Sequence, residues 1–325
     1  MGTEDYNELT SNFDLLSTIE MVKLMNQEDK KVPLAIEKVL PDIARAIDII
    51  VECFKKGGRL LYVGAGTSGR LGILDSAECP PTFGVDPEMV QAIIAGGERA
   101  ITSAVEYAED DVKQGREEIE RRSISDNDAV VGITASGTTP FVLSALEEAH
   151  KRGARTILLT NNYNSPAKDF VDIAIEIDTG PEVIAGSTRL KAGTSQKMVL
   201  NMFSTISMVK LGKVYGNIMV DVRPTNQKLI NRAIRIITKI TGATEELALE
   251  RLKACNMNVK EAIISIVGNL GPEESRRLLE ESDGYLRVAL EKIRAKSVFL
   301  RRPCYTDGKA DFKAGGDLRG NEEVI

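Results

Sequence analysis

Apolar residues recur along the chain at two different spacings, and the spacing changes near residue 58. Between residues 12 and 55 they recur every three or four positions, which is typical of amphipathic helices. Two lysines and two glycines, residues 55–58, end this stretch, and glycine is common just past helix ends. We therefore predict an N-terminal helical region over residues 1–55.

Short apolar runs bounded by polar residues or glycine replace the helical spacing from residue 58 to about residue 180. Such runs are typical of strands that are buried in a parallel sheet. They lie at residues 59–63, 90–95, 129–134, 156–160 and 171–177, with helical segments expected at about 98–122, 139–152 and 193–213. Alternating strands and helices indicate right-handed βαβ units. The predicted fold class of residues 56–224 is therefore α/β, with a doubly wound parallel sheet flanked by helices.

Helical spacing returns after Arg223-Pro224-Thr225. Segments with this spacing lie at residues 226–241, 244–254, 258–268, 272–281 and 284–296. We predict a small all-helical C-terminal domain over residues 225–296. Residues 297–325 are polar, rich in glycine and without periodicity, so we expect an irregular tail there.

A glycine-rich turn, residues 64–69, joins the first strand run to a helix. Its spacing matches the dinucleotide-binding fingerprint, but the acidic residue expected about 20 positions later comes late, at Glu98. Gly66, Thr67 and Ser68 instead place two hydroxyls beside N–H groups at a helix N-terminus, which suits a phosphate monoester. The alternative is a tight turn with a Ser/Thr cap and no ligand.

A second hydroxyl-rich turn, residues 134–140, follows the third strand run and opens another helix. It contributes Ser136, Thr138 and Thr139 as candidate phosphate ligands. In an open parallel sheet both turns lie at the carboxyl ends of strands, where ligands bind. Because neither turn has the lysine of a Walker motif, the pair favours a phosphorylated sugar.

A third loop, residues 180–197, precedes a long helix. It contributes Ser187, Arg189 and Lys191 as candidate ligands, since arginine and lysine suit a phosphate or carboxylate group. The alternative is a helix cap with solvated basic residues.

Two glutamates are candidate general acid or base groups. Glu78 continues an apolar stripe that includes Leu74, at the expected end of a helix, so it should be buried enough for general-acid chemistry near neutrality. Glu109 lies at the edge of the apolar face expected for a helix at residues 98–110, near its C-terminus, where a carboxylate opposes the helix dipole. For both residues the alternative is a solvated position at a helix edge.

Composition and charge exclude several classes of function. The 325 residues include 42 Lys and Arg against 48 Asp and Glu, a net charge of −6, which argues against nucleic-acid binding. His150 is the one histidine, so a multi-histidine metal site is excluded and carboxylates are the expected proton carriers. No apolar run approaches the ~18 residues of a membrane span, and the acidic N-terminus is not a secretory signal. Since the four cysteines form no disulfide framework, we expect a cytoplasmic protein without metal or membrane contact.

Several segments resemble those of N-acetylmuramic acid 6-phosphate etherases. They are GAGTSGRLGILDSAECPPTFG (64–84), AVEYAEDD (104–111), GITASGTTP (132–140), PEVIAGSTRLKAGTSQKMVLNMFST (181–205) and VKLGKVYGNIMVDVR (209–223). The resemblance runs from about Leu16 to about Leu270, and Thr138 stands where many etherases have arginine. It implies a sugar isomerase (SIS) domain followed by a helical unit similar to a UBA domain at about 242–270.

The resemblance also implies an activity. A carbon–oxygen lyase of this family cleaves the D-lactyl ether of N-acetylmuramic acid 6-phosphate, giving N-acetylglucosamine 6-phosphate and D-lactate, in cell-wall amino-sugar catabolism and recycling. The two glutamates that act in the family fall on Glu78 and Glu109, and the phosphate-binding hydroxyls of SIS proteins fall on Thr67, Ser68 and Ser136. Two carboxyl groups suffice for elimination and water addition, so we expect no cofactor.

Two other functions stay open. An aldose–ketose sugar-phosphate isomerase needs a base at C2 but no acid for a leaving group, and a sugar-phosphate sensor like the glucokinase regulatory protein, a much longer chain, needs neither. The presence of both Glu78 and Glu109 favours the etherase. The expected partners are a small amino-sugar phosphate and a second copy of the chain.

We expect a homodimer because the N-terminal helices and the helix at 193–213 have more apolar surface than one contact needs. The alternative is that the C-terminal domain of the same chain covers this surface.

Overall fold

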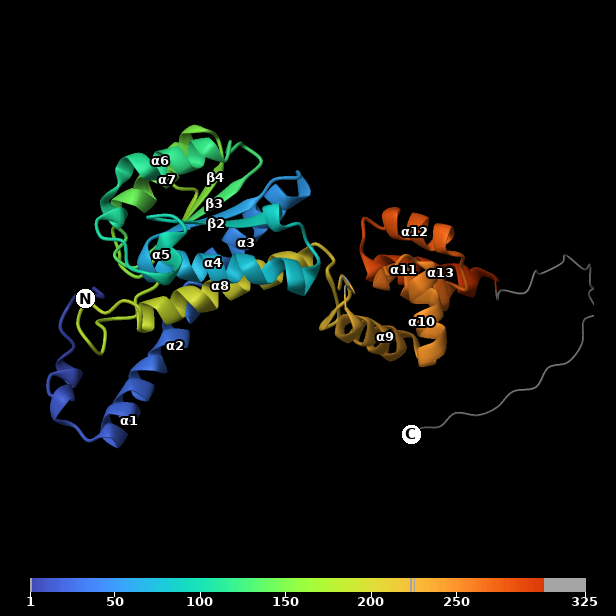
Figure 1. Ribbon diagram of the computed structural model, residues 1–325, viewed down its shortest axis with the longest axis horizontal. Coiled ribbons are helices and arrows are strands. Elements are labelled where there is room, and N and C mark those ends of the chain that lie inside the picture. The colour runs from blue at the N-terminus through green and yellow to red at the C-terminus, as the bar shows by residue number, and fades with distance from the viewer. Residues whose placement is uncertain (1, 223, 225, 301–325) are drawn as a thin grey trace, which may run out of the picture.

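Five parallel strands form the central sheet of the computed structural model, which describes residues 2–222, 224 and 226–300 (Figure 1). They are β1 (Leu60–Gly64), β2 (Val90–Ile94), β3 (Ala129–Thr134), β4 (Arg155–Thr160) and β5 (Ile173–Glu176). Each strand lies within or next to a predicted apolar run. Their Val, Ile and Leu content is explained by burial on both faces.

The strand order, β2-β1-β3-β4-β5, creates a switch point between β1 and β3. The chain moves outward from β1 to β2 and then crosses back to form β3 on the other side of β1. Gly64 pairs with Ile133, so β1 and β3 end side by side. Loops that leave the two strands turn toward opposite faces of the sheet and open a crevice between them, where ligands of such folds bind. The two predicted hydroxyl-rich turns are these loops.

Helices cover both faces of the sheet (Figure 1). One layer holds α3 (Leu40–Lys55), α4 (Gly66–Phe83) and α8 (Lys191–Lys210), and the other holds α6 (Val112–Arg121) and α7 (Pro140–Lys151). Alternate residues of each strand pack against the two helix layers, because successive side chains of a strand point to opposite faces of the sheet. Tyr62 and Val131 belong to the core with α3 and α8, whereas Leu61 and Val130 belong to the core with α6 and α7.

The helix predicted at residues 98–122 is broken into three pieces, so that prediction was wrong. They are α5 (Arg99–Thr102), a 3-10 turn (Ala108–Asp110) and α6. Tyr107 has a left-handed φ of 59°, which a helix cannot accommodate. Asp111 then starts α6 as its N-cap, because its carboxylate accepts a hydrogen bond from Gln114 N at 2.8 Å.

Helix α4 runs through Pro80 and Pro81 instead of ending before them. It ends at Gly84, whose left-handed φ of 65° suits a glycine cap and whose N–H donates to the Pro80 carbonyl. The two carbonyls that the prolines leave without a partner belong to Ser76 and Ala77, which are not buried, so water can satisfy them. The helix is therefore longer than predicted.

The C-terminal domain consists of helices and a short antiparallel hairpin. Its elements are β6 (Val214–Tyr215), β7 (Ile218–Met219), α9 (Gln227–Thr241), α10 (Glu245–Ala254), α11 (Val259–Gly268), α12 (Pro272–Glu280) and α13 (Leu286–Leu300). The predicted helices are confirmed. Val220 and Val222 pack into the same core as Ile237, so the hairpin and the segment after it pack with the helices. Of the tail predicted at 297–325, residues 301–325 lie outside the described residues, and residues 297–300 are the end of α13, so the irregular structure expected for these four residues was wrong.

The predicted N-terminal helical region is present as 3-10 turns at Glu8–Thr10 and Phe13–Leu15, followed by α1 (Thr18–Asp29), α2 (Lys31–Glu37) and α3. Helix α3 packs against α8 and the sheet, whereas α1 extends away from the α/β domain (Figure 1).

Candidate functional site

A pocket of about 320 Å³ lies at the switch point between β1 and β3. It gathers six of the predicted site residues, which come from both turns and from the loop before α6: Gly66, Thr67, Ser68, Ser136, Thr139 and Glu109. It is completed by residues that the sequence reasoning missed: Glu4, Ala65, Ile133, Thr134, Ala135, Gly186 and Thr188.

The first turn presents the N-terminus of α4 to this pocket. Its N-cap is Ala65, which has no side chain to accept hydrogen bonds from the first helical turn. The N–H groups of that turn are therefore available to an anion. A β-carbon at Gly64 would lie 2.6 Å from Gly69 N, so only glycine permits strand and helix to approach this closely. The turn thus presents free N–H donors at a helix N-terminus, the arrangement that suits a phosphate group.

A buried chain of amides fixes the hydroxyl of Ser68. Ser68 Oγ donates to Gln196 Oε1 at 2.8 Å, and Gln196 Nε2 donates to Asn161 Oδ1 at 3.0 Å. Asn161 Nδ2 in turn donates to the Ile177 carbonyl at 3.3 Å. Because a carbonyl only accepts, this last bond sets the orientation of both amides and commits the one hydroxyl hydrogen of Ser68 to Gln196. In this state Ser68 offers an anion its backbone N–H and not its hydroxyl.

The hydroxyl of Ser136 is arranged in the opposite way. Its oxygen accepts from Thr138 N at 3.2 Å and from Thr138 Oγ1 at 3.1 Å. With both lone pairs used, its hydrogen is left for a ligand or for Thr134 Oγ1, 3.3 Å away. Thr139 Oγ1 lies 2.8 Å from the same Thr134 oxygen. Thr138 itself is exposed and outside the pocket, so it orients Ser136 instead of lining the site.

Glu109 lies between two adjoining pockets. It lines the 320 Å³ pocket and a second pocket of about 250 Å³, whose lining includes Arg70 and residues 103–109. Arg70 donates to the carbonyls of Ile101 at 3.0 Å and Ser103 at 3.1 Å, and so holds the start of the loop that leads to Glu109. Glu109 is on the 3-10 turn and not on the apolar face of a long helix, so its predicted setting is corrected although it lies in the site.

The structure corrects the prediction that Glu78 is buried. The buried face of α4 contains Gly72, Asp75 and Cys79, whereas Leu74 and Glu78 are exposed. The predicted buried face, which included Leu74 and Glu78, was wrong because the residues of α4 that pack against the sheet are small or polar, and apolar periodicity does not detect such a face. Glu78 is also about 18 Å along the helix from Gly66, at 1.5 Å per residue. In one chain, therefore, Glu78 and Glu109 do not line one pocket.

Asp75, which the sequence reasoning passed over, is the centre of a buried polar cluster. It accepts from Tyr62 Oη at 3.0 Å, from Ser204 Oγ at 3.2 Å and from Lys197 Nζ at 3.4 Å. Burial raises the pKa of Asp75 above its ordinary value, against the opposing effect of these donors. The cluster joins β1, α4 and α8, and Asp75 lies about 14 Å along α4 from Gly66.

Lys191 is not a pocket residue, and its prediction as a phosphate ligand is corrected. Its side chain is 1% exposed, and its ammonium pairs with Glu28 at 2.7 Å. Its backbone N–H and that of Ala192 donate to the buried Glu182 carboxylate at 2.9 and 3.0 Å. Lysine is thus turned inward at the start of α8, where sequence reasoning had placed it in a solvated loop.

The other two candidates from the same loop also lie outside the pocket. Arg189 is exposed and Ser187 is half-buried, and neither lines the site. Thr188, between them, does line it.

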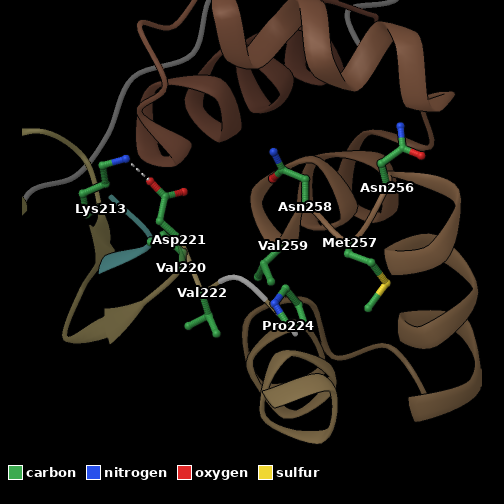
Figure 2. A pocket seen from close by; sticks show the side chains of 10 residues that line it. Lys213, Val220, Asp221, Val222, Pro224, Asn256, Met257, Asn258 and Val259 are labelled. Atoms are coloured by element: carbon green, nitrogen blue, oxygen red, sulfur yellow. Dashed lines mark ion pairs between the residues drawn. The ribbon is translucent and has the colours of Figure 1, made fainter. Parts of the chain in front are cut away.

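A larger cleft of about 480 Å³ lies where the α/β domain meets the C-terminal domain (Figure 2). Its charged side chains, Lys213 and Asp221, are paired at 2.8 Å, and Asp221 also pairs with Lys260 at 2.9 Å. None of its described lining residues has a hydroxyl group or lies at the end of a β-strand of the main sheet. The smaller pocket at the switch point is therefore the candidate site.

Two further searches were confined to residues 2–222, 224 and 226–300. No group of three or more His, Cys, Asp or Glu residues in this part of the chain is placed to hold a metal ion. No helix in it combines the length and apolar character needed to cross a bilayer.

Comparison with known proteins connects this chain and its fold to one family. Residues 42–150 match the model of the glucokinase regulatory protein N-terminal SIS domain, residues 113–206 match the SIS domain, and residues 216–264 match the C-terminal lid domain of glucokinase regulatory protein. The chain is 55% identical to an N-acetylmuramic acid 6-phosphate etherase of Caldanaerobacter subterraneus subsp. tengcongensis, covering 89% of this chain and 94% of the relative. It is 52% identical to an enzyme of the same name from Clostridium beijerinckii, covering 90% and 96%. The predicted SIS fold is confirmed.

Proposed function

Because the chain belongs to the N-acetylmuramic acid 6-phosphate etherase family, we propose that it cleaves the D-lactyl ether of N-acetylmuramic acid 6-phosphate. The products are N-acetylglucosamine 6-phosphate and D-lactate, which makes the chain a carbon–oxygen lyase of cell-wall amino-sugar catabolism and recycling. The observation that supports this activity best is the pocket at the switch point. It combines an uncapped helix N-terminus, hydroxyl groups and the carboxylate of Glu109.

We assign the 6-phosphate to the cradle formed by the two turns. The N–H groups of Gly66, Thr67 and Ser68 and the hydroxyls of Ser136 and Thr139 are its ligands in this proposal. No lysine or arginine lines the described 320 Å³ pocket, so neutral donors and the dipole of α4 hold the anion. The sugar then extends from this end toward Glu109.

The chemistry needs one base and one acid, and no cofactor. With the sugar ring open, the C1 aldehyde acidifies the C2 proton, and Glu109 removes it. The electron pair forms the C2–C3 double bond as the C3–O bond breaks, and the departing lactate oxygen takes a proton from Glu78. Water then adds at C3, giving its proton to Glu78, while Glu109 returns a proton to C2. Each carboxyl group thereby regains its starting state.

We propose a homodimer in which Glu78 reaches the pocket of the partner subunit. The distance of about 18 Å along α4 prevents it from serving its own site. Leu74, four residues earlier on the same helix face, is 46% exposed, as expected for a surface that a second copy covers. The alternative to sharing is that Glu78 has no part in the reaction.

The N-terminal arm, here residues 6–22, has a larger exposed apolar surface than helix α8. Its exposed side chains are Tyr6 (86%), Leu9 (69%), Leu15 (78%), Ile19 (60%) and Val22 (57%). Helix α8, in contrast, is largely covered by α2, α3 and α4 of its own chain, and only Ile206 and Val209 remain about 40% exposed among the apolar residues on which the dimer expectation rested. The arm is therefore a better candidate for subunit contact than α8.

Incubation with N-acetylmuramic acid 6-phosphate in labelled water tests the activity. Release of D-lactate, with solvent oxygen at C3 and solvent deuterium at C2 of the product, is the expected result. Aldose–ketose conversion of sugar phosphates without lactate release would support an isomerase. Tight binding of sugar phosphates without any turnover would support a sensor, the function of glucokinase regulatory protein relatives.

We further propose a cytoplasmic location and a division into four parts. Cys53, Cys79 and Cys255 are buried free thiols, which suits a reducing compartment. The proposed parts are the helical region 1–55, the SIS domain 56–224, the UBA-like helical domain 225–296 and the tail 297–325. The hairpin at residues 214–219 packs with the helical domain and α13 continues to Leu300, so the contacts of the helical domain extend a few residues beyond both of its bounds.

A further inference from the structure

The N-terminal segment Gly2–Thr10, here called the strap, is fastened to the loops that border the pocket. Thr3, Asn7 and Thr10 are its buried side chains. Thr3 N donates to Asn162 Oδ1 at 3.0 Å, and Asn162 Nδ2 donates to Thr3 Oγ1 at 2.8 Å. Near the other end, Thr10 Oγ1 donates to the Val183 carbonyl at 2.9 Å. The strap is therefore a fixed wall of the site and not a loose end.

Glu4 extends from this strap into the pocket. It lies between the buried anchors Thr3 and Asn7, and it is itself exposed and lines the cavity together with the hydroxyl-rich turns. Its carboxylate approaches the loop before α8, because a β-carbon at Gly186 would lie 3.3 Å from Glu4 Oε2. The fold thus brings residue 4 to the same cavity as Glu109 and Ser136.

The Glu4 carboxylate is without a partner in the described part of the chain. No described side chain or backbone group donates a hydrogen bond to it, and it forms no ion pair there. An ionised carboxylate accepts hydrogen bonds and repels a phosphate dianion. A ligand in this cavity must therefore direct its phosphate to the α4 cradle and a neutral O–H or N–H donor to Glu4.

We propose that Glu4 is a substrate-binding residue that accepts a hydrogen bond from a hydroxyl or acetamido N–H group of the amino sugar. Thr3 and Asn162 are the positioning residues that hold it in place. The identity of the sugar rests on the proposed function, whereas the separation of a phosphate end from a sugar end rests on the charges of the pocket.

Calorimetric binding to two ligands tests this role. Glu4→Ala should weaken the binding of N-acetylglucosamine 6-phosphate about 10- to 100-fold, which is the effect of losing a hydrogen bond to a charged group. Its affinity for inorganic phosphate should stay the same or increase, because a negative charge has been removed. Glu4→Gln keeps one acceptor and should recover part of the loss. Glu8→Gln, on the same strap but outside the cavity, is the matched control and should change neither affinity.

Thr3→Val tests whether the strap positions Glu4. It removes the hydroxyl that Asn162 binds, and it should reproduce part of the Glu4→Ala effect. The double variant, Thr3→Val with Glu4→Ala, should bind the sugar phosphate no more weakly than Glu4→Ala alone, since both changes act through one carboxylate. In turnover, both single variants should raise KM more than they lower kcat.

Three results would overturn the proposal. Unchanged binding of the sugar phosphate by Glu4→Ala would remove Glu4 from the site, and an equal loss for both ligands would make its role structural. Failure of the unaltered protein to bind N-acetylglucosamine 6-phosphate would overturn it together with the proposed function. If the protein binds this ligand but releases no lactate, the etherase proposal fails while selective weakening by Glu4→Ala still supports Glu4.

Discussion

Replacing Lys191 with methionine should destabilise the fold and leave phosphate binding almost unchanged. The Lys191 ammonium is buried against Glu28, whose side chain is 2% exposed, with 2.7 Å between the charged atoms. Burial alone would raise the pKa of Glu28, but hydrogen bonds from Lys191 and Lys31 outweigh it and hold the pKa below the ordinary value of 4.5. Removing Lys191 leaves a buried carboxylate with one cation fewer.

The size of the effect follows from what remains around Glu28. Removing one partner of a buried pair costs about 3–5 kcal/mol. Glu28 keeps Lys31 at 2.5 Å and Asn7 at 3.3 Å, which places the expected loss near the lower end, about 3 kcal/mol. With a urea dependence of about 3 kcal/mol per molar, the unfolding midpoint should fall by about 1 M. Far-UV circular dichroism is the suitable probe because the chain has no tryptophan.

The loss should also depend on pH in a defined direction. Because the pKa of Glu28 is lowered in the folded state, its stabilisation is present above pH 4.5 and is lost as the pH falls through the folded pKa. The difference in free energy of unfolding between the unaltered protein and Lys191→Met should therefore be largest above pH 4.5, and it should become smaller as the pH falls below that value.

Arg189→Met supplies the control for this prediction. Arg189 is exposed two residues away, so its removal should change the free energy of unfolding by less than about 0.5 kcal/mol. Equal midpoints for the two variants, with weaker phosphate binding by Lys191→Met alone, would refute the reasoning and return Lys191 to the site.

Other predictions concern the reaction and the subunits. Glu78→Gln and Glu109→Gln should each lower turnover about 10²- to 10⁴-fold without loss of folding, because both residues are exposed; turnover close to that of the unaltered protein would remove either from the mechanism. Mixing the two inactive variants should restore about a quarter of full activity, since half of the reassorted dimers regain one intact shared site; no recovery after subunit exchange would contradict sharing. Light scattering should give twice the 35.5 kDa of one chain, and a fully active monomer would contradict the dimer. Ser136→Ala should weaken sugar-phosphate binding by about 1–3 kcal/mol, and Ser68→Ala by less, because Gln196 already takes the Ser68 hydrogen; an equal loss for a ligand without phosphate would contradict both assignments.

The sheet and the two turns could be predicted because their causes are local. Short Val- and Ile-rich runs bounded by glycine form buried strands, and parallel strands bring their following turns to one edge. Gly66, Thr67, Ser68 and Ser136 thus met in one pocket as the sequence indicated.

The remaining features depend on contacts between distant parts of the chain. Glu28, which neutralises Lys191, lies 163 positions away, so a basic residue in a loop gave no indication of burial. The buried face of α4 was set by Tyr62 and Ser204 around Asp75, which apolar periodicity does not detect. Glu4 lies in a polar N-terminal stretch whose sequence gives no sign of where it docks.

Helix α8 links the pocket mechanically to the C-terminal domain. Its first turns contain Gln196, which holds Ser68, and its last turn leads directly into the hairpin that packs with α9 (Figure 1). Its 20 residues form a rod about 30 Å long. The helix that holds the Ser68 hydroxyl in the site therefore continues, at its other end, into the C-terminal domain.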